Sequence, residues 1–147
     1  MATIPLPPDF KEFLKLLNSH NVKYLLIGGY AVNYYGYARA TADMDIWVGI
    51  SPENADGTSA AVREFGFMQA TVHLFLEPGN VIRMGLPPFR IEVLTSVSGV
   101  EFSDCFRKRN VVDIGGLQVS LIAIDDLRAN KRASGRTKDL ADLEQLD

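Results

Sequence analysis

The feature that most constrains this chain is a pair of glycines followed by two acids that alternate within an apolar stretch. Gly28 and Gly29 end one apolar run, and Asp43 and Asp45 lie in the next one. In a strand, residues two apart point to the same face, about 6.7 Å apart along the chain. The two carboxylates therefore share a face, where they repel each other unless a cation or a proton lies between them. This spacing predicts a cation site.

The glycine pair predicts a second kind of site beside the first. Glycine adopts backbone conformations that other residues avoid, and its missing side chain lets an anion approach the backbone N–H groups. A helix predicted to start here would direct its N-terminal N–H groups at such an anion. Gly28 and Gly29 therefore predict a phosphate site next to the predicted cation site, a combination typical of nucleotide chemistry. The alternative is that they only form a tight junction between a strand and a helix.

Composition limits the class of protein. With 147 residues, 47% hydrophobic and 22% charged, the chain is predicted to form one globular domain over residues 1–147. A net charge of -3 argues against a general nucleic-acid-binding domain. The single cysteine, Cys105, excludes an internal disulfide and a thiolate zinc cluster. No apolar run approaches the ~20 residues that cross a bilayer, so we expect a cytoplasmic protein without a membrane partner.

The pattern of apolar residues predicts an α+β fold. Phe10, Phe13, Leu14 and Leu17 recur at helical spacing after Pro8, which predicts a first helix. Strands are predicted at 22–27, 43–48, 72–76, 81–84, 89–94, 111–114 and 117–121, and further helices at 30–35, 51–65, 124–134 and 137–146. The expected architecture is a mixed β-sheet with helices packed on it and two C-terminal helices.

The order of the motifs resembles that of a minimal nucleotidyltransferase of the DNA-polymerase-β-like superfamily. That family has an apolar strand ending in Gly-Gly or Gly-Ser, then an Asp-x-Asp strand, then a third acid on another strand. Here these positions are Gly28 and Gly29, Asp43 and Asp45, and Glu92. The residues from 130 to 140 are similar to a helical element of the smaller bacterial members, so the resemblance covers essentially the whole chain.

The resemblance implies an enzyme that moves a nucleoside monophosphate, most simply AMP from ATP, from a nucleoside triphosphate to a hydroxyl group. Asp43, Asp45 and Glu92 would be the catalytic residues and would hold Mg²⁺ or Mn²⁺. Glu92 would alternatively act as general base on the incoming hydroxyl. The nucleotide-binding residues would be Gly28, Gly29, Arg39, Thr41, Lys131, Arg136 and Lys138.

The resemblance leaves the acceptor open. Small bacterial members of this group modify a protein tyrosine, a tRNA end or an antibiotic, and several belong to toxin–antitoxin pairs. A chain of 147 residues has no room for a large acceptor-binding domain. A partner protein or a homodimer is therefore expected to build the rest of the site.

Two differences from the family pattern support a second hypothesis, a module that keeps the fold and binds nucleotide or a partner without turnover. Gly29 stands where serine is common, and Glu92 stands where aspartate is common. The extra methylene of glutamate moves its carboxylate by roughly 1.5 Å, enough to disturb a catalytic position. Glu92 would instead form an ordinary cross-strand ion pair with Arg90 or Arg83. The basic residues near the C-terminus would then be a solvated charged face.

Overall fold

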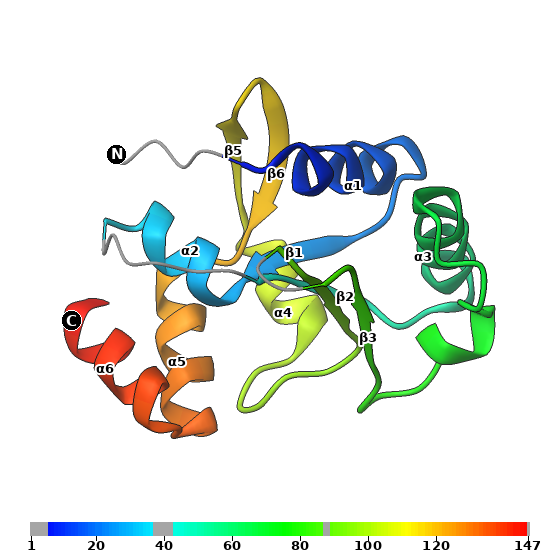
Figure 1. Cartoon of the computed structure of the whole chain (residues 1–147). Coiled ribbons are helices and arrows are strands. Elements are labelled where there is room, and N and C mark those ends of the chain that lie inside the picture. The colour runs from blue at the N-terminus through cyan, green and yellow to red at the C-terminus, as the bar shows by residue number, and fades with distance from the viewer. Residues whose placement is uncertain (1–5, 37–42, 87–88, 147) are drawn as a thin grey trace.

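Among the residues that the structure describes, a mixed sheet of six strands forms the centre of the protein (Figure 1). The structure, a computed structural model, describes residues 6–36, 43–86 and 89–146. The strand order is β3-β4-β2-β1-β6-β5. The strands are β1 (Tyr24–Ile27), β2 (Met44–Val48), β3 (Val81–Met84), β4 (Ile91–Leu94), β5 (Asn110–Ile114) and β6 (Leu117–Leu121). Because β2 pairs in parallel with β4 and β1 with β6, while the other neighbours are antiparallel, the predicted mixed α+β sheet is confirmed.

Helices lie on both sides of this sheet. Figure 1 shows α1 and α3 on one side and the paired helices α5 and α6 on the other. The helices are α1 (Pro8–Ser19), α2 (Gly28–Tyr34), α3 (Pro52–Phe65), α4 (Phe102–Arg107), α5 (Ile124–Ser134) and α6 (Thr137–Leu146). None of the helices in the described part of the chain is long and apolar enough to span a membrane.

The first helix forms as its sequence predicts. Proline occupies the first turn of α1, where its missing N–H costs no helical hydrogen bond. Phe10, Phe13, Leu14 and Leu17 form one stripe and are completely buried in the core. Each such side chain contributes about 1.5–3 kcal/mol by leaving water, so this stripe fixes α1 against the rest of the core.

Apolar and acidic side chains alternate at the start of β2, so that Met44 and Ile46 point into the core and Asp45 points to the opposite face of the sheet. Met44 and Ile46 are completely buried, as predicted for the face that points away from the acids. Asp45 lies between Ile27 of β1 and Glu92 of β4 in the sheet register. The parallel pairing of β2 and β4 therefore brings two acids that are far apart in the sequence to adjacent positions.

The prediction of a strand at 72–76 is wrong. The segment forms a short 3-10 helix, η1 (Val72–Phe75), that packs against α3. Its turn directs Phe75 into the core, where the side chain is completely buried. The carbonyl of Leu74 accepts a hydrogen bond from the Asn80 side chain at 2.9 Å, so this backbone group is satisfied without a neighbouring strand.

The two predicted C-terminal helices are confirmed, and Gly135 separates them. Its φ of +65° is left-handed, a conformation that glycine adopts without the cost that a side chain imposes. The chain reverses there, so that α6 packs against α5. This reversal brings the basic residues of the C-terminal segment back towards the sheet.

Candidate functional site

A cavity of about 430 Å³ lies between the acidic face of the sheet and the junction of α5 with α6. It is lined by Ile27, Gly28, Gly29, Asp43, Asp45, Glu92, Leu94, Ser96, Val97, Ser98, Asn130, Lys131, Ser134, Arg136, Lys138 and Asp139. Every predicted site residue that the structure describes is in this set. Arg39 and Thr41, the other two predicted nucleotide-binding residues, lie outside the described residues.

The acids concentrate negative charge at one wall of the cavity. Burial raises the pKa of Asp45 to about 6, and the carboxylates of Glu92 and Asp43 act in the same direction. The positive charges of Lys138 and Lys131 oppose this shift. Such a carboxylate is stabilised in its ionised form by an added cation.

Gly28 lies in close contact with the same acid. It directly follows β1 and begins α2 with a φ of +68°. A Cβ built on Gly28 would fall well inside van der Waals contact of Asp45 Oδ2, so only glycine leaves room for this carboxylate. The glycine pair thus serves two purposes, because it opens the backbone to the cavity and also accommodates Asp45.

Arg83 of β3 and Arg90, which precedes β4, contact the acidic wall. Arg90 Nη2 donates to Asp43 Oδ2 at 3.0 Å and lies 3.5 Å from Glu92 Oε1. Arg83 Nε lies 3.7 Å from the same Glu92 oxygen. The cross-strand ion pair considered for Glu92 is therefore present, although the Glu92 side chain also lines the cavity.

The acids suit a hard divalent cation that arrives with further ligands. Within the described ranges, no three His, Cys, Asp or Glu side chains are grouped so that they alone hold a metal ion. Mg²⁺ is commonly bound by one or two carboxylates together with waters and phosphate oxygens. Asp43 and Asp45 fit that arrangement, since both line the cavity and crowd negative charge there. Glu92 as a third ligand stays a prediction.

The three predicted basic residues occupy different positions at the opposite wall. Lys131 is buried, and its Nζ lies 2.9 Å from Asp142 Oδ2 and 3.2 Å from Asp139 Oδ1. Arg136 contacts Asp139 as well, but its side chain is 63% exposed. Lys138 is exposed and makes no hydrogen bond or ion pair with another described residue. Arg136 and Lys138 are thus the cations open to a ligand.

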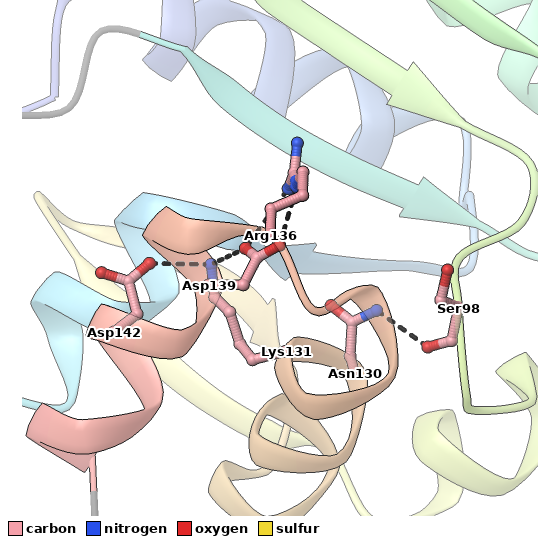
Figure 2. A network of polar contacts seen from close by, with 6 residues as sticks. All are labelled: Ser98, Asn130, Lys131, Arg136, Asp139 and Asp142. Atoms are coloured by element: carbon pink, nitrogen blue, oxygen red, sulfur yellow. Dashed lines mark hydrogen bonds and ion pairs between the residues drawn. The ribbon is translucent and has the colours of Figure 1, made fainter.

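Sequence reasoning missed several residues that shape this wall (Figure 2). Asn130 Nδ2 donates to the carbonyl of Ser98 at 2.9 Å and so fixes the loop after β4 to α5. Asp139 and Asp142 hold Lys131 between α5 and α6. The spacing of Asp139, three residues after Arg136 within a basic segment, was the available signal, because residues three apart on a helix are neighbours.

Comparisons with known proteins identify the fold. No protein-family model matches the chain, and no curated protein matches it. Among solved structures, a protein of Thermotoga maritima provisionally described as a nucleotidyltransferase is 13% identical with a TM-score of 0.65, over 92% of this chain and 88% of that one. The solution structure of the antibiotic-resistance factor ANT(2'')-Ia is 12% identical with a TM-score of 0.61, over 94% and 80%.

A third solved structure is also similar to this chain in fold. It is the crystal structure of ANT(2'')-Ia in complex with adenylyl-2''-tobramycin, which is 13% identical with a TM-score of 0.56, over 93% of this chain and 84% of that one. Likeness at this level of identity shows the fold and not the activity. The protein has the nucleotidyltransferase fold, as the resemblance in its sequence implied.

Proposed function

We propose that this protein is a metal-dependent nucleotidyltransferase that moves a nucleoside monophosphate, AMP from ATP, to a hydroxyl group. The observation that carries the proposal is the cavity, in which an acidic wall (Asp43, Asp45 and Glu92) faces exposed cations (Arg136 and Lys138). A triphosphate with its metal ion needs both kinds of wall. A structural ion pair would not require an acidic wall and exposed cations at the same cavity, and neither would a solvated charged face.

Each residue has a role that follows from its position. Asp43 and Asp45 would hold Mg²⁺ or Mn²⁺, which offsets the charge of the triphosphate and orients the transferred phosphorus. Gly28 and Gly29 line the cavity without side chains, so a phosphate can approach their backbone. Arg136 and Lys138 would neutralise the departing pyrophosphate. Lys131 would act through the residues that it holds, while Arg39 and Thr41 stay predicted phosphate contacts.

Glu92 would accept the proton of the attacking hydroxyl or complete the metal site. Either role requires its carboxylate to leave Arg83 and Arg90, whose nitrogens lie 3.7 and 3.5 Å from it. Both distances exceed the 2.7–2.9 Å that is typical of a strong charge-assisted hydrogen bond, so the pairs are loose. Glu92 is therefore held near the cavity by contacts that a substrate can replace.

The acceptor is a hydroxyl of a protein tyrosine, a tRNA end or a small molecule. The complex of ANT(2'')-Ia with adenylyl-2''-tobramycin supports the small-molecule class, because that protein has the same fold. A cytoplasmic bacterial enzyme that works with a partner protein, as a homodimer or within a toxin–antitoxin pair fits the same chemistry. The transfer assay below identifies the acceptor class directly.

The proposal is tested by following the label of ATP in the presence of Mg²⁺. The protein is incubated with ATP labelled on the α- or the γ-phosphorus and with separate pools of cell protein, tRNA and hydroxylated antibiotics. Label from the α-phosphorus, but not from the γ-phosphorus, is expected on one pool. The Asp43→Asn/Asp45→Asn variant should lose this transfer.

Asp125→Asn is the matched control, because Asp125 is an 88% exposed acid that pairs with Arg128 and does not line the cavity. It should transfer as the wild type does. Transfer of the γ-label, or transfer that survives in the Asp43→Asn/Asp45→Asn variant, would contradict the proposal.

A nucleotide-binding module without turnover is the second candidate. The bond from Arg90 to Asp43 favours it, because the arginine occupies an acid that the enzyme would need for its metal. This candidate predicts ATP binding by the wild type with no label on any acceptor pool. The same assay, combined with a calorimetric titration of ATP, separates the two.

A further inference from the structure

Four charged residues at the junction of α5 and α6 form one connected network (Figure 2). Lys131 of α5 contacts Asp139 and Asp142 of α6, and Asp139 in turn contacts Arg136, which precedes α6. The side chains of Lys131, Asp139 and Asp142 are 4%, 1% and 3% exposed, whereas that of Arg136 is 63% exposed. The network therefore runs from the interior of the protein to a cation at the cavity.

The contact between Asp139 and Arg136 fixes the guanidinium in two places. Arg136 Nε donates to Asp139 Oδ2 at 2.7 Å, and Nη2 donates to Oδ1 at 3.3 Å. A two-pronged bond of this kind sets the plane of the guanidinium as well as its position. The guanidinium carries more N–H groups than Asp139 uses, so donors remain for a ligand in the cavity.

Arg136 also faces the acidic wall. Its pKa is raised, first by the hydrogen bond to Asp139 and further by the charges of Asp139, Asp45 and Glu92. The guanidinium thus lies where the acids on β2 and β4 act on it. A triphosphate between the two walls would meet both this cation and the metal that those acids hold.

Stability alone is a weak reason for the network. Burying three charged side chains costs several kcal/mol per ion, and apolar residues of similar size often serve a core equally well or better. A long, exposed arginine would adopt many rotamers without Asp139. The network instead gives this arginine one orientation towards the cavity.

We propose that Asp139 is a positioning residue that orients Arg136 for the β- and γ-phosphates of the nucleotide, with Lys131 holding Asp139 in place. This inference rests on the proposed function for the identity of the ligand. It assigns Asp139 a role that depends on geometry and not on charge. It also makes Lys131 a support for the phosphate site and not a direct ligand.

Asp139→Asn and Asp142→Asn form a matched pair for the test. Each removes one of the two carboxylates that contact Lys131, but only Asp139 contacts Arg136. Removing either negative charge raises the electrostatic attraction of the cavity for an anion. A purely electrostatic role therefore predicts equal or tighter binding in both variants, whereas a positioning role predicts weaker binding in Asp139→Asn alone.

The measurement is a calorimetric titration of the folded wild type and both variants with tripolyphosphate, ATP and AMP, each with Mg²⁺. Asp139→Asn should weaken the binding of tripolyphosphate and ATP about tenfold, by analogy with the lower end of the loss found when a residue that orients a metal ligand is replaced. Asp142→Asn should remain near the wild type, and AMP should bind all three proteins alike. Equal or tighter binding of tripolyphosphate by Asp139→Asn overturns the proposal.

The transfer assay and the tripolyphosphate titration together distinguish failure of the positioning role of Asp139 from failure of the proposed function. If the wild type transfers AMP and the variants bind tripolyphosphate as the wild type does, the positioning role of Asp139 is overturned and the proposed enzymatic function stands. If only Asp139→Asn binds tripolyphosphate more weakly and no assay detects transfer, the positioning role is supported and the proposed enzymatic function is overturned. A wild type that binds neither tripolyphosphate nor ATP overturns both.

A measurement on the wild type covers the case in which Asp139→Asn does not fold. The NMR signal of the Arg136 Nε–H group is assigned by its absence in Arg136→Lys. Its bond to Asp139 predicts slow exchange with water, and tripolyphosphate with Mg²⁺ should shift it. A rapidly exchanging signal, or one that tripolyphosphate does not move, contradicts the proposal.

Discussion

Gly28 and Asp45 show how single residues shape the cavity. The backbone of Gly28 has a left-handed φ of +68°, and the Asp45 carboxylate lies against the space that a Cβ would fill. The sequence indicated a glycine turn and an acidic pair separately. Their direct contact depends on the antiparallel pairing of β1 with β2, in which Ile27 lies opposite Asp45.

Gly28→Ala is predicted to abolish most nucleotidyl transfer. The new methyl group displaces the Asp45 carboxylate, and a displacement of about 1 Å at a catalytic group is enough to lower a rate roughly 100-fold. The left-handed backbone conformation adds a cost of about 1–2 kcal/mol to the folded state. The measurements are transfer from α-labelled ATP and unfolding in urea.

Gly115→Ala is the control that separates backbone strain from the loss of the site. Gly115 has a similar φ of +60°, lies in the turn between β5 and β6, and would bring its Cβ only to 3.9 Å from Lys11 Nζ. It should lose a similar amount of stability and keep its transfer activity. Equal activity in the two variants would show that Gly28 does not control the position of Asp45.

The α5–α6 pair illustrates how a charged network joins two elements. Burial alone would raise the pKa of Asp139, but bonds from Arg136 and Ser134 and the contact with Lys131 outweigh it and lower that pKa to about 2. The ordinary value is 3.8. The ionised carboxylate therefore stabilises the folded state above pH 3.8, and this contribution is lost as the pH falls towards 2.

We therefore expect Asp139→Asn to flatten the acid dependence of stability. Between pH 5 and pH 2 the free energy of unfolding of the wild type should fall by about 2 kcal/mol more than that of the variant, the value that follows from the lowered pKa. Unfolding in urea at a series of pH values measures the difference. Parallel curves for the two proteins would show that the Asp139 carboxylate is not stabilised in the folded state.

The elements themselves were largely predictable from local pattern. The stripe in α1, the alternation in β2 and the break at Gly135 each follow from residues close in sequence. The segment from Val72 to Phe75 was not predictable, because its apolar residues suit a strand as well as a turn packed on α3. Only tertiary packing decides between them.

At the scale of the whole molecule, the site combines segments from both ends of the chain. The positions of Gly28 at a strand–helix junction and of Asp45 and Glu92 on strands were predicted, because each depends on a short local motif. The pairing of Lys131 with Asp139 and Asp142 was not, because it needs the reversal that packs α6 on α5. The exposed or buried state of a lysine is decided by that packing and not by its neighbours in sequence.

A nucleotide site in this cavity requires the acids of one wall to bind the metal ion that accompanies ATP. Paramagnetic broadening by Mn²⁺ tests this most directly, because a bound Mn²⁺ ion removes the NMR signals of amides close to it. ATP with Mn²⁺ is added to isotope-labelled protein, with the Asp43→Asn/Asp45→Asn variant beside it. The signals of Gly28, Gly29, Asp45 and Glu92 should disappear first in the wild type and persist in the variant. Broadening centred elsewhere, or equal in the two proteins, would contradict the nucleotide site.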